Sequence, residues 1–219
     1  MKNIIKKVAF FDFTGTLFDP FIKIKLILNE ISKINNYKFF KLEELKEIKK
    51  MPPLELLNEF SVPKTDIKQV VNQVLSILEN EIEEVPPIMG IENFILHLKN
   101  ENYYLGILSS NTKSNIIKWL NAYNLNLFDD VITIPFQESK LTYLTNIKEN
   151  FGTASEFIFI SDEVKDLTQA KDSGFTPYGV SWGFDSISNL RLVSGVEILN
   201  NPNDFIKMHT KKNEDFQPV

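Results

Sequence analysis

The stretch V-A-F-F-D-F-T-G-T-L-F-D, residues 8–19, decides how this chain folds. Its first four residues, Val8 to Phe11, form a short apolar run bounded by a turn signal, which predicts a fully buried strand of a parallel sheet. The run stops at Asp12, and Gly15 follows in the next turn. Open α/β sheets bind ligands at the carboxyl ends of their strands, and amides beside a glycine can face an anion. We therefore predict an anion site at Asp12, with a simple turn-capping role for this carboxylate as the alternative.

A helical pattern fills the chain from Pro20 to about Val85, where apolar residues recur at three- and four-residue spacing. Prolines punctuate this segment, and no alternation typical of strands interrupts it. The pattern predicts a helical module inserted directly after the first strand. We expect residues 1–18 and 87–219 to form an α/β core and residues 19–86 to form an all-helical cap.

Helices and strands alternate after Pro87, which predicts an α/β fold with a doubly wound, Rossmann-like parallel sheet and right-handed crossovers. A polar tail, residues 211–219, is expected to fray. The expected helices are Ile91–Lys99, Ile116–Tyr123, Lys140–Asn150, Glu163–Ser173 and 204–209, and the expected strands are Tyr103–Leu108, Val131–Ile134, Phe157–Ile160, Thr176–Val180 and 196–199.

Composition excludes several classes of protein. The chain has 219 residues, of which 43% are hydrophobic and 24% charged, as in globular proteins. It contains no cysteine, so disulfides, thiolate zinc sites and cysteine nucleophiles are excluded. No apolar stretch approaches the roughly 18 residues that span a bilayer. Because the basic start, Met1 to Lys7, runs straight into the first strand, we expect no signal peptide, no membrane partner and a cytoplasmic location. A net charge of -5 argues against nucleic acid as a partner.

Residues suited to phosphoryl chemistry follow the expected strands. Asp12, Ser109 and Asp162 each end one, Lys140 follows another, and Asp166 lies one helical turn beyond Asp162. Three converging carboxylates would repel one another without a cation, and an all-oxygen set suits Mg²⁺. Each residue also has a structural alternative: a helix cap, a favourable charge at a helix N-terminus, or a solvated lysine.

Four motifs in order resemble those of the haloacid dehalogenase-like (HAD) superfamily. F-F-D-F-T-G-T-L-F-D resembles the first motif, L-G-I-L-S-S-N the second, Lys140 the third and I-S-D-E-V-K-D the fourth. The stretch D-E-V-K-D-L-T-Q-A-K-D-S-G-F, continuing to G-V-S-W-G-F, is similar to phosphoglycolate-phosphatase-like members, whose helical cap the inserted segment resembles. The resemblance covers essentially the whole chain.

The resemblance implies a mechanism. Asp12 would take the phosphoryl group as an aspartyl-phosphate. Mg²⁺ would be held by Asp12, the backbone carbonyl of Thr14 and Asp162, with Asp166 in support. Lys140 and the metal would shield the phosphate charge, so the implied catalytic residues are Asp12, Thr14 and Lys140. The implied substrate-binding residues are Phe13, Ser109, Ser110 and Asn111.

Thr14 departs from the pattern of this superfamily. Its phosphatases carry a second Asp two residues after the nucleophile, which protonates the leaving oxygen and then activates water. A threonine hydroxyl cannot titrate to do this, and such help is typically worth ~10²–10⁴ in rate. P-type ATPases of the superfamily resemble this chain here, with Thr at this position and a persistent aspartyl-phosphate.

Three functions therefore stay open. The first is a slow or specialised Mg²⁺-dependent phosphatase of a small phosphate ester, perhaps best described as one whose leaving group needs no acid. The second is a phosphate-binding or regulatory protein with impaired turnover, and the third is a phosphotransferase. The expected partner is a small phosphorylated molecule, and a monomer or weak dimer is expected. No cap residue indicates the substrate by its type.

Overall fold

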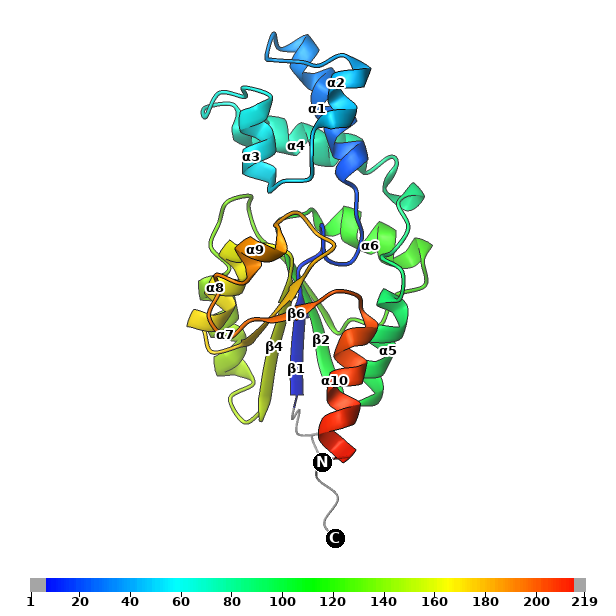
Figure 1. Ribbon diagram of the computed structural model, residues 1–219, viewed down its shortest axis with the longest axis vertical. Coiled ribbons are helices and arrows are strands. Elements are labelled where there is room, and N and C mark those ends of the chain that lie inside the picture. The colour runs from blue at the N-terminus through cyan, green and yellow to red at the C-terminus, as the bar shows by residue number, and fades with distance from the viewer. Residues whose placement is uncertain (1–6, 215–219) are drawn as a thin grey trace.

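A single parallel sheet forms the centre of the molecule. The computed structural model describes residues 7–214, and the side chains of residues 7–209. Within this part of the chain, the strands lie in the order β3-β2-β1-β4-β5-β6, all parallel (Figure 1). This confirms the expected doubly wound α/β fold. The strands are β1 (Lys7–Phe11), β2 (Tyr103–Ser109), β3 (Asp130–Thr133), β4 (Glu156–Ser161), β5 (Thr176–Val180) and β6 (Glu197–Leu199).

Strand β1 is central and buried on both faces. Ala9 and Phe11 pack into one apolar cluster, while Val8 and Phe10 pack into another on the opposite face. This alternation follows from the two-residue period of a strand, and burial of both faces explains the continuous apolar run. Helices α5 (Ile91–Asn100), α6 (Lys113–Ala122) and α10 (Asn203–Glu214) cover the first face, and α7 (Leu141–Asn150) and α8 (Val164–Asp172) cover the second (Figure 1).

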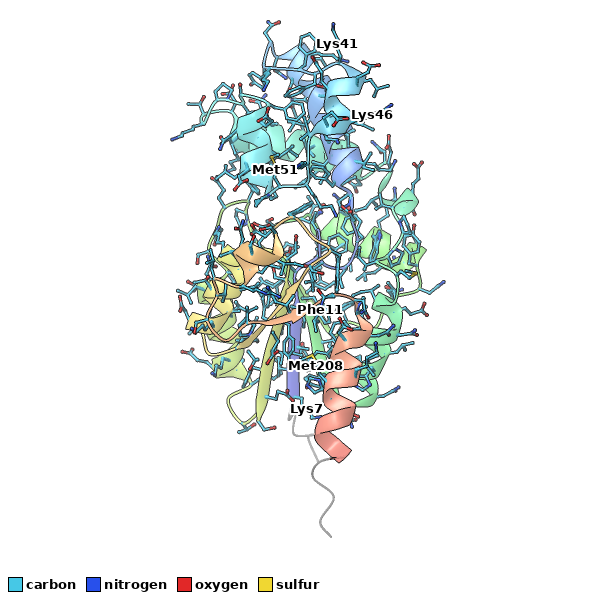
Figure 2. The ribbon with its side chains drawn as sticks, in the orientation of Figure 1. Lys7, Phe11, Lys41, Lys46, Met51 and Met208 are labelled. Carbon is cyan, nitrogen blue, oxygen red and sulfur yellow. The ribbon has the colours of Figure 1, made fainter. Side chains whose placement is uncertain are left out.

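The inserted helical segment lies over the carboxyl edge of the sheet (Figure 1). It has a hydrophobic core of its own, to which Phe184 from the loop after β5 contributes. Figure 2 shows Lys41 and Lys46 on this segment at the opposite end of the molecule from Lys7. We call this segment the cap. Its helices are α1 (Phe21–Ile34), α2 (Leu42–Glu47), α3 (Pro53–Glu59), α4 (Ile67–Leu78) and the 3₁₀ helix η1 (Ile82–Glu84).

Local capping explains where the observed elements differ from the expected ones. Helix α6 begins three residues before Ile116, because the Thr112 side chain accepts a hydrogen bond from the Asn115 amide at 3.2 Å. The short helix α9 (Ile187–Leu190), which follows a Ser186 cap, was not predicted. Helix α10 continues to Glu214, so the expectation of a frayed tail is wrong for residues 211–214, and residues 215–219 lie outside the described part.

Membrane insertion finds no support in the helices. Throughout residues 7–214, every helix is too short or too polar to cross a bilayer.

Candidate active site

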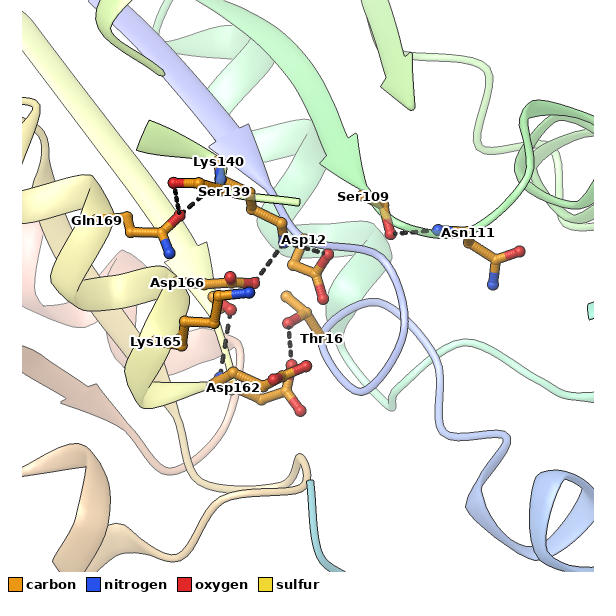
Figure 3. A network of polar contacts seen from close by, with 12 residues as sticks. Asp12, Thr16, Ser109, Asn111, Ser139, Lys140, Asp162, Lys165, Asp166 and Gln169 are labelled. Atoms are coloured by element: carbon orange, nitrogen blue, oxygen red, sulfur yellow. Dashed lines mark hydrogen bonds and ion pairs between the residues drawn. The ribbon is translucent and has the colours of Figure 1, made fainter. Parts of the chain in front are cut away.

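Asp12, Lys140 and Asp166 form a buried ion cluster at the carboxyl edge of the sheet (Figure 3). Asp12 follows β1 directly, and its amide donates to the Ile160 carbonyl of β4 at 2.8 Å, which extends the strand pairing to this residue. The Lys140 Nζ, at the start of α7, donates to Asp12 Oδ1 at 2.7 Å and to Asp166 Oδ2 at 2.5 Å. All three side chains are at most 8% exposed, so water screens these charges little.

The charges of this cluster control one another. Burial raises the pKa of Asp12, and the positive charge of Lys140 opposes this shift. Burial alone would lower the pKa of Lys140, but the carboxylates of Asp12 and Asp166 raise it above its ordinary value. Lys140 is therefore a permanent cation at neutral pH, held against the carboxylate that ends the central strand.

Gln169 of α8 positions the start of the helix that carries Lys140. Its Oε1 accepts hydrogen bonds from the Lys140 amide at 2.6 Å and the Leu141 amide at 3.1 Å. These are amides of the first turn, which have no partner inside the helix. The Lys140 Nζ also lies 5.5 Å from the centre of the Phe159 ring. The direction of the lysine is thus determined from two neighbouring elements, α8 and β4.

Asp162 is enclosed on all sides at the end of β4. Its Oδ1 accepts from the Thr16 hydroxyl and its Oδ2 from the Phe184 amide, both at 2.8 Å. A Cβ added at Gly15 would lie 2.2 Å from Asp162 Oδ2, and one at Gly183 would lie 2.0 Å from Asp162 Cβ. Burial, with the negative charge of Asp12, raises the pKa of Asp162 to about 7. The two glycines are therefore required for this carboxylate to fit.

Glu163 joins the acidic residues of the site, which the sequence reading had not anticipated. Carboxylate oxygens of Asp12, Glu163 and Asp166 lie within 4.8 Å of one another and could hold a metal ion. Oxygen donors alone suit a hard cation such as Mg²⁺. Asp162 lies beside this group rather than in it, with each oxygen already accepting one hydrogen bond. A carboxylate oxygen has a second lone pair, so these bonds leave Asp162 able to bind a metal.

The loop after β2 places three predicted binding residues beside Asp12. Ser109 is buried, and its Oγ accepts from the Asn111 amide at 3.3 Å. Ser110 lines the space in front of Asp12. The Asn111 Nδ2 donates to Thr14 Oγ1 at 3.0 Å, so the Thr14 hydroxyl accepts here and its own proton is left to donate elsewhere.

Phe13 lies differently from the other predicted binding residues. Its side chain is fully buried, with its ring centre 4.5 Å from that of Phe18 and 5.4 Å from that of Trp119. The Phe13 amide faces the site instead, where its hydrogen bond to Asp12 lowers the pKa of that carboxyl group. Only the backbone of Phe13 is therefore placed to contact a ligand.

Two cavities meet at Asp12. One, of about 110 Å³, is bordered by Lys140, Asp166 and Lys165 and is rich in polar groups. The other, of about 90 Å³, lies between the core and the cap and is bordered by Thr14 together with apolar side chains. The two cavities share Asp12, Pro53, Ser110, Phe136 and Glu163 as lining residues.

A comparison with known families accounts for this arrangement. The profile of the haloacid dehalogenase-like hydrolases matches residues 9–180, a span that holds Asp12, Lys140, Asp162 and the whole cap. This chain belongs to that family. The family assignment agrees with the order of the four motifs along the sequence.

Individual relatives are similar over nearly their whole length. A phosphoglycolate phosphatase of Synechococcus elongatus is 20% identical over 203 residues, which are 92% of this chain and 96% of the relative. A haloacid dehalogenase-like hydrolase from Streptococcus pneumoniae superposes with a TM-score of 0.75 at 21% identity, covering 93% of this chain and 98% of that one. A predicted phosphoglycolate phosphatase from Haemophilus somnus gives 0.73 at 16%, with the same coverage. At these identities the solved structures establish the fold alone.

In this haloacid dehalogenase-like hydrolase, sequence reasoning missed four residues that shape the site. Glu163 could have been noticed as the third acid of I-S-D-E-V-K-D. Gln169, Thr16 and Gly183 carry no local signal, because each acts on a residue distant in sequence.

Proposed function

We propose that this chain is a Mg²⁺-dependent phosphatase of a small phosphate monoester that works through an aspartyl-phosphate on Asp12. The observation that carries the proposal is the buried Asp12 carboxylate, paired with Lys140 beside a group of acids able to hold a cation. The phosphoglycolate phosphatase among its relatives supports a phosphate ester as substrate.

Lys140 and Asp12 divide the first step between them. Lys140 holds one oxygen of the Asp12 carboxylate, Oδ1, and thereby orients the other toward the phosphorus of a bound ester. A new bond from this oxygen to phosphorus forms as the bond from phosphorus to the alcohol oxygen breaks. Water then attacks the phosphorus of the aspartyl-phosphate, which releases inorganic phosphate and restores the carboxylate. The same lysine offers its positive charge to the transferring group.

A cation would complete the charge balance of the site. Asp12, Asp162, Glu163 and Asp166, with the backbone carbonyl of Thr14, are the residues that would hold it. When bound, Mg²⁺ would neutralise phosphate charge that otherwise repels an anionic nucleophile. Titration with Mn²⁺, followed by electron paramagnetic resonance, tests this set. We expect Asp162→Asn and Glu163→Gln each to weaken binding, and a variant with unchanged affinity removes its residue from the set.

Thr14 determines which leaving groups this site can expel. Because its hydroxyl accepts from Asn111, its proton can donate a hydrogen bond to the leaving oxygen. A hydroxyl stabilises developing charge in this way but transfers no proton at neutral pH. We therefore expect esters with low-pKa leaving groups, such as acetyl phosphate, to react much faster than alkyl phosphates, for which general acid catalysis is worth ~10²–10⁴.

Trapping the intermediate tests the proposal directly. Protein incubated with Mg²⁺ and acetyl phosphate, quenched in acid and measured by intact mass, should gain one phosphoryl group, and Asp12→Asn should gain none. Hydrolysis of acetyl phosphate and p-nitrophenyl phosphate should be lost in the same variant. Absence of both adduct and turnover would overturn the phosphatase.

Thr14 also favours a second candidate function, a phosphate-binding or regulatory protein that turns over poorly. Binding of inorganic phosphate without turnover of any ester would support it. A phosphotransferase would instead form the adduct and lose it faster when an alcohol acceptor is added.

A further inference from the structure

The apolar cavity at Asp12 is the part of the molecule that the chemistry of phosphate does not explain. Cap side chains Ile24, Leu28, Leu57 and Val74 form its walls, and Phe136 and Phe184 of the core complete it. The cavity reaches Asp12 and Thr14 directly. A group bound here would therefore be attached to the phosphate that Asp12 attacks.

The charges around this cavity disfavour a negatively charged occupant. Among the residues described, no cationic side chain lines it, and its titratable lining residues are the acids Asp12 and Glu163. Two cap lysines that could have reached inward are engaged elsewhere. The Lys25 Nζ donates to the Ile48 carbonyl at 3.2 Å, and the Lys50 Nζ pairs with Asp19 at 2.5 Å. A carboxylate in this cavity would lose its hydration without gaining a partner, which is costly.

The size of the cavity limits the occupant further. Its volume is about 90 Å³, whereas a dry cavity that binds benzene measures roughly 150 Å³. A chain of a few carbons fits with the cap in the observed position, and an aromatic ring does not.

From these features we propose that the substrate carries a short, aliphatic, uncharged group, which the cap binds in the apolar cavity while the phosphate occupies the polar one. This inference rests on the proposed phosphatase function and specifies its substrate class. It sets this chain apart from a phosphatase whose substrate bears a carboxylate next to the phosphate.

A pair of isosteric inhibitors tests the charge of the occupant. Isobutylphosphonate and phosphonoacetate have nearly the same shape, but only the second bears a carboxylate. Calorimetry with Mg²⁺ should show at least tenfold tighter binding of isobutylphosphonate. From methyl- to propylphosphonate, affinity should rise up to about fourfold per methylene, and it should fall again for phenylphosphonate. Equal or tighter binding of phosphonoacetate would overturn the inference.

Two lysine substitutions on one helix provide a matched test. Val74 lines the cavity, while Ile77, one turn further along α4, is 42% exposed and borders the outer groove. Val74→Lys should reverse the preference toward phosphonoacetate, and Ile77→Lys should leave both affinities unchanged. Leu57→Ala avoids a buried charge, and it should move the preferred chain length upward. An unchanged preference in folded Val74→Lys, or an unchanged optimum in Leu57→Ala, would contradict the proposal.

The two proposals can fail separately. Loss of all acetyl phosphate turnover and trapping in the wild-type protein rejects the phosphatase. A working phosphatase that binds phosphonoacetate more tightly than isobutylphosphonate rejects only the substrate class.

Discussion

The two surfaces that enclose Asp12 are built from opposite kinds of residue. The edge of the sheet presents buried charges, Asp12, Lys140, Asp162 and Asp166, each held by at least one hydrogen bond. The cap presents apolar side chains to the same space. Phosphate chemistry needs fixed charges, which a sheet edge positions rigidly. The group attached to phosphate varies between substrates, and helices of an inserted segment can change without disturbing that edge.

Removing Lys140 should have the largest effect, because it tests whether the chemistry lies in the core. Lys140→Met leaves the buried carboxylates of Asp12 and Asp166 without their cation. We expect turnover to fall by about 10²–10³ and the free energy of unfolding at pH 8 to fall by about 3–5 kcal/mol.

The pH dependence of this loss is a check on its cause. Burial already raises the pKa of Asp12, and loss of Lys140 raises it further. A carboxyl group whose pKa is higher in the folded state binds protons on folding, so the variant should regain stability as the pH falls from 8 toward 5. Urea unfolding at both pH values measures this, and an equal loss at both would contradict the electrostatic explanation.

Thr14→Asp should produce the next largest effect, a gain. The new carboxyl group would lie where the Thr14 hydroxyl now accepts from Asn111 and borders the apolar cavity. As a general acid it should raise turnover of alkyl phosphates by up to ~10², with little change for acetyl phosphate. Steady-state rates on both esters measure this, and no gain on any alkyl phosphate would mean that proton transfer does not limit the wild-type protein.

Gly183→Ala should cause a smaller loss by displacing one charge of the sheet edge. The added methyl group would lie 2.0 Å from Asp162 Cβ. Overpacking of this kind costs about 1–3 kcal/mol, and we expect Mg²⁺-dependent turnover to fall by roughly tenfold for each 1.4 kcal/mol that the displacement costs the site. Gly152→Ala is the control, because its methyl group would meet only a backbone oxygen at 3.3 Å. Equal effects of the two substitutions would show that Asp162 tolerates displacement.

Sequence reasoning succeeded where chemistry follows strands and failed where it depends on facing. Buried parallel strands are continuous apolar runs, so the polar residues that end them, such as Asp12 and Asp162, could be predicted at one edge. The residues that enclose Asp162 could not, since Gly183 and Phe184 reach it from a separate loop. The apolar cavity was also unpredictable. Helical periodicity gives Val74 and Val70 the same signature, although only Val74 lines the cavity.

The polar contacts between α6 and the cap join the two surfaces. The Asn115 Nδ2 donates to the Leu75 carbonyl of α4 at 3.1 Å, and the Lys118 Nζ donates to the Glu79 carbonyl at 2.8 Å. Trp119 Nε1 donates to the Val85 carbonyl at 2.8 Å. Each hydrogen bond contributes only about 0.5–1.5 kcal/mol. A cap held by a few such bonds could open to admit substrate and close over it, as lids of many enzymes do.

Asn115→Ala should have the smallest effect, and it tests this junction. The substitution removes the bond to Leu75 and leaves Asn111 Oδ1 with its bond from the Thr112 amide at 2.8 Å, so Asn111 can still reach Thr14. Loss of about 1 kcal/mol from the closed state should speed amide hydrogen exchange several-fold in α4 and η1 while the strands keep their protection. Asn121→Ala is the control, since Asn121 lies exposed on the same helix. Faster exchange in the cap alone would show that cap and core separate as two bodies. Exchange that accelerates equally in strands and cap would show that they unfold together, and the contrast between a fixed edge and a movable cap would then be wrong.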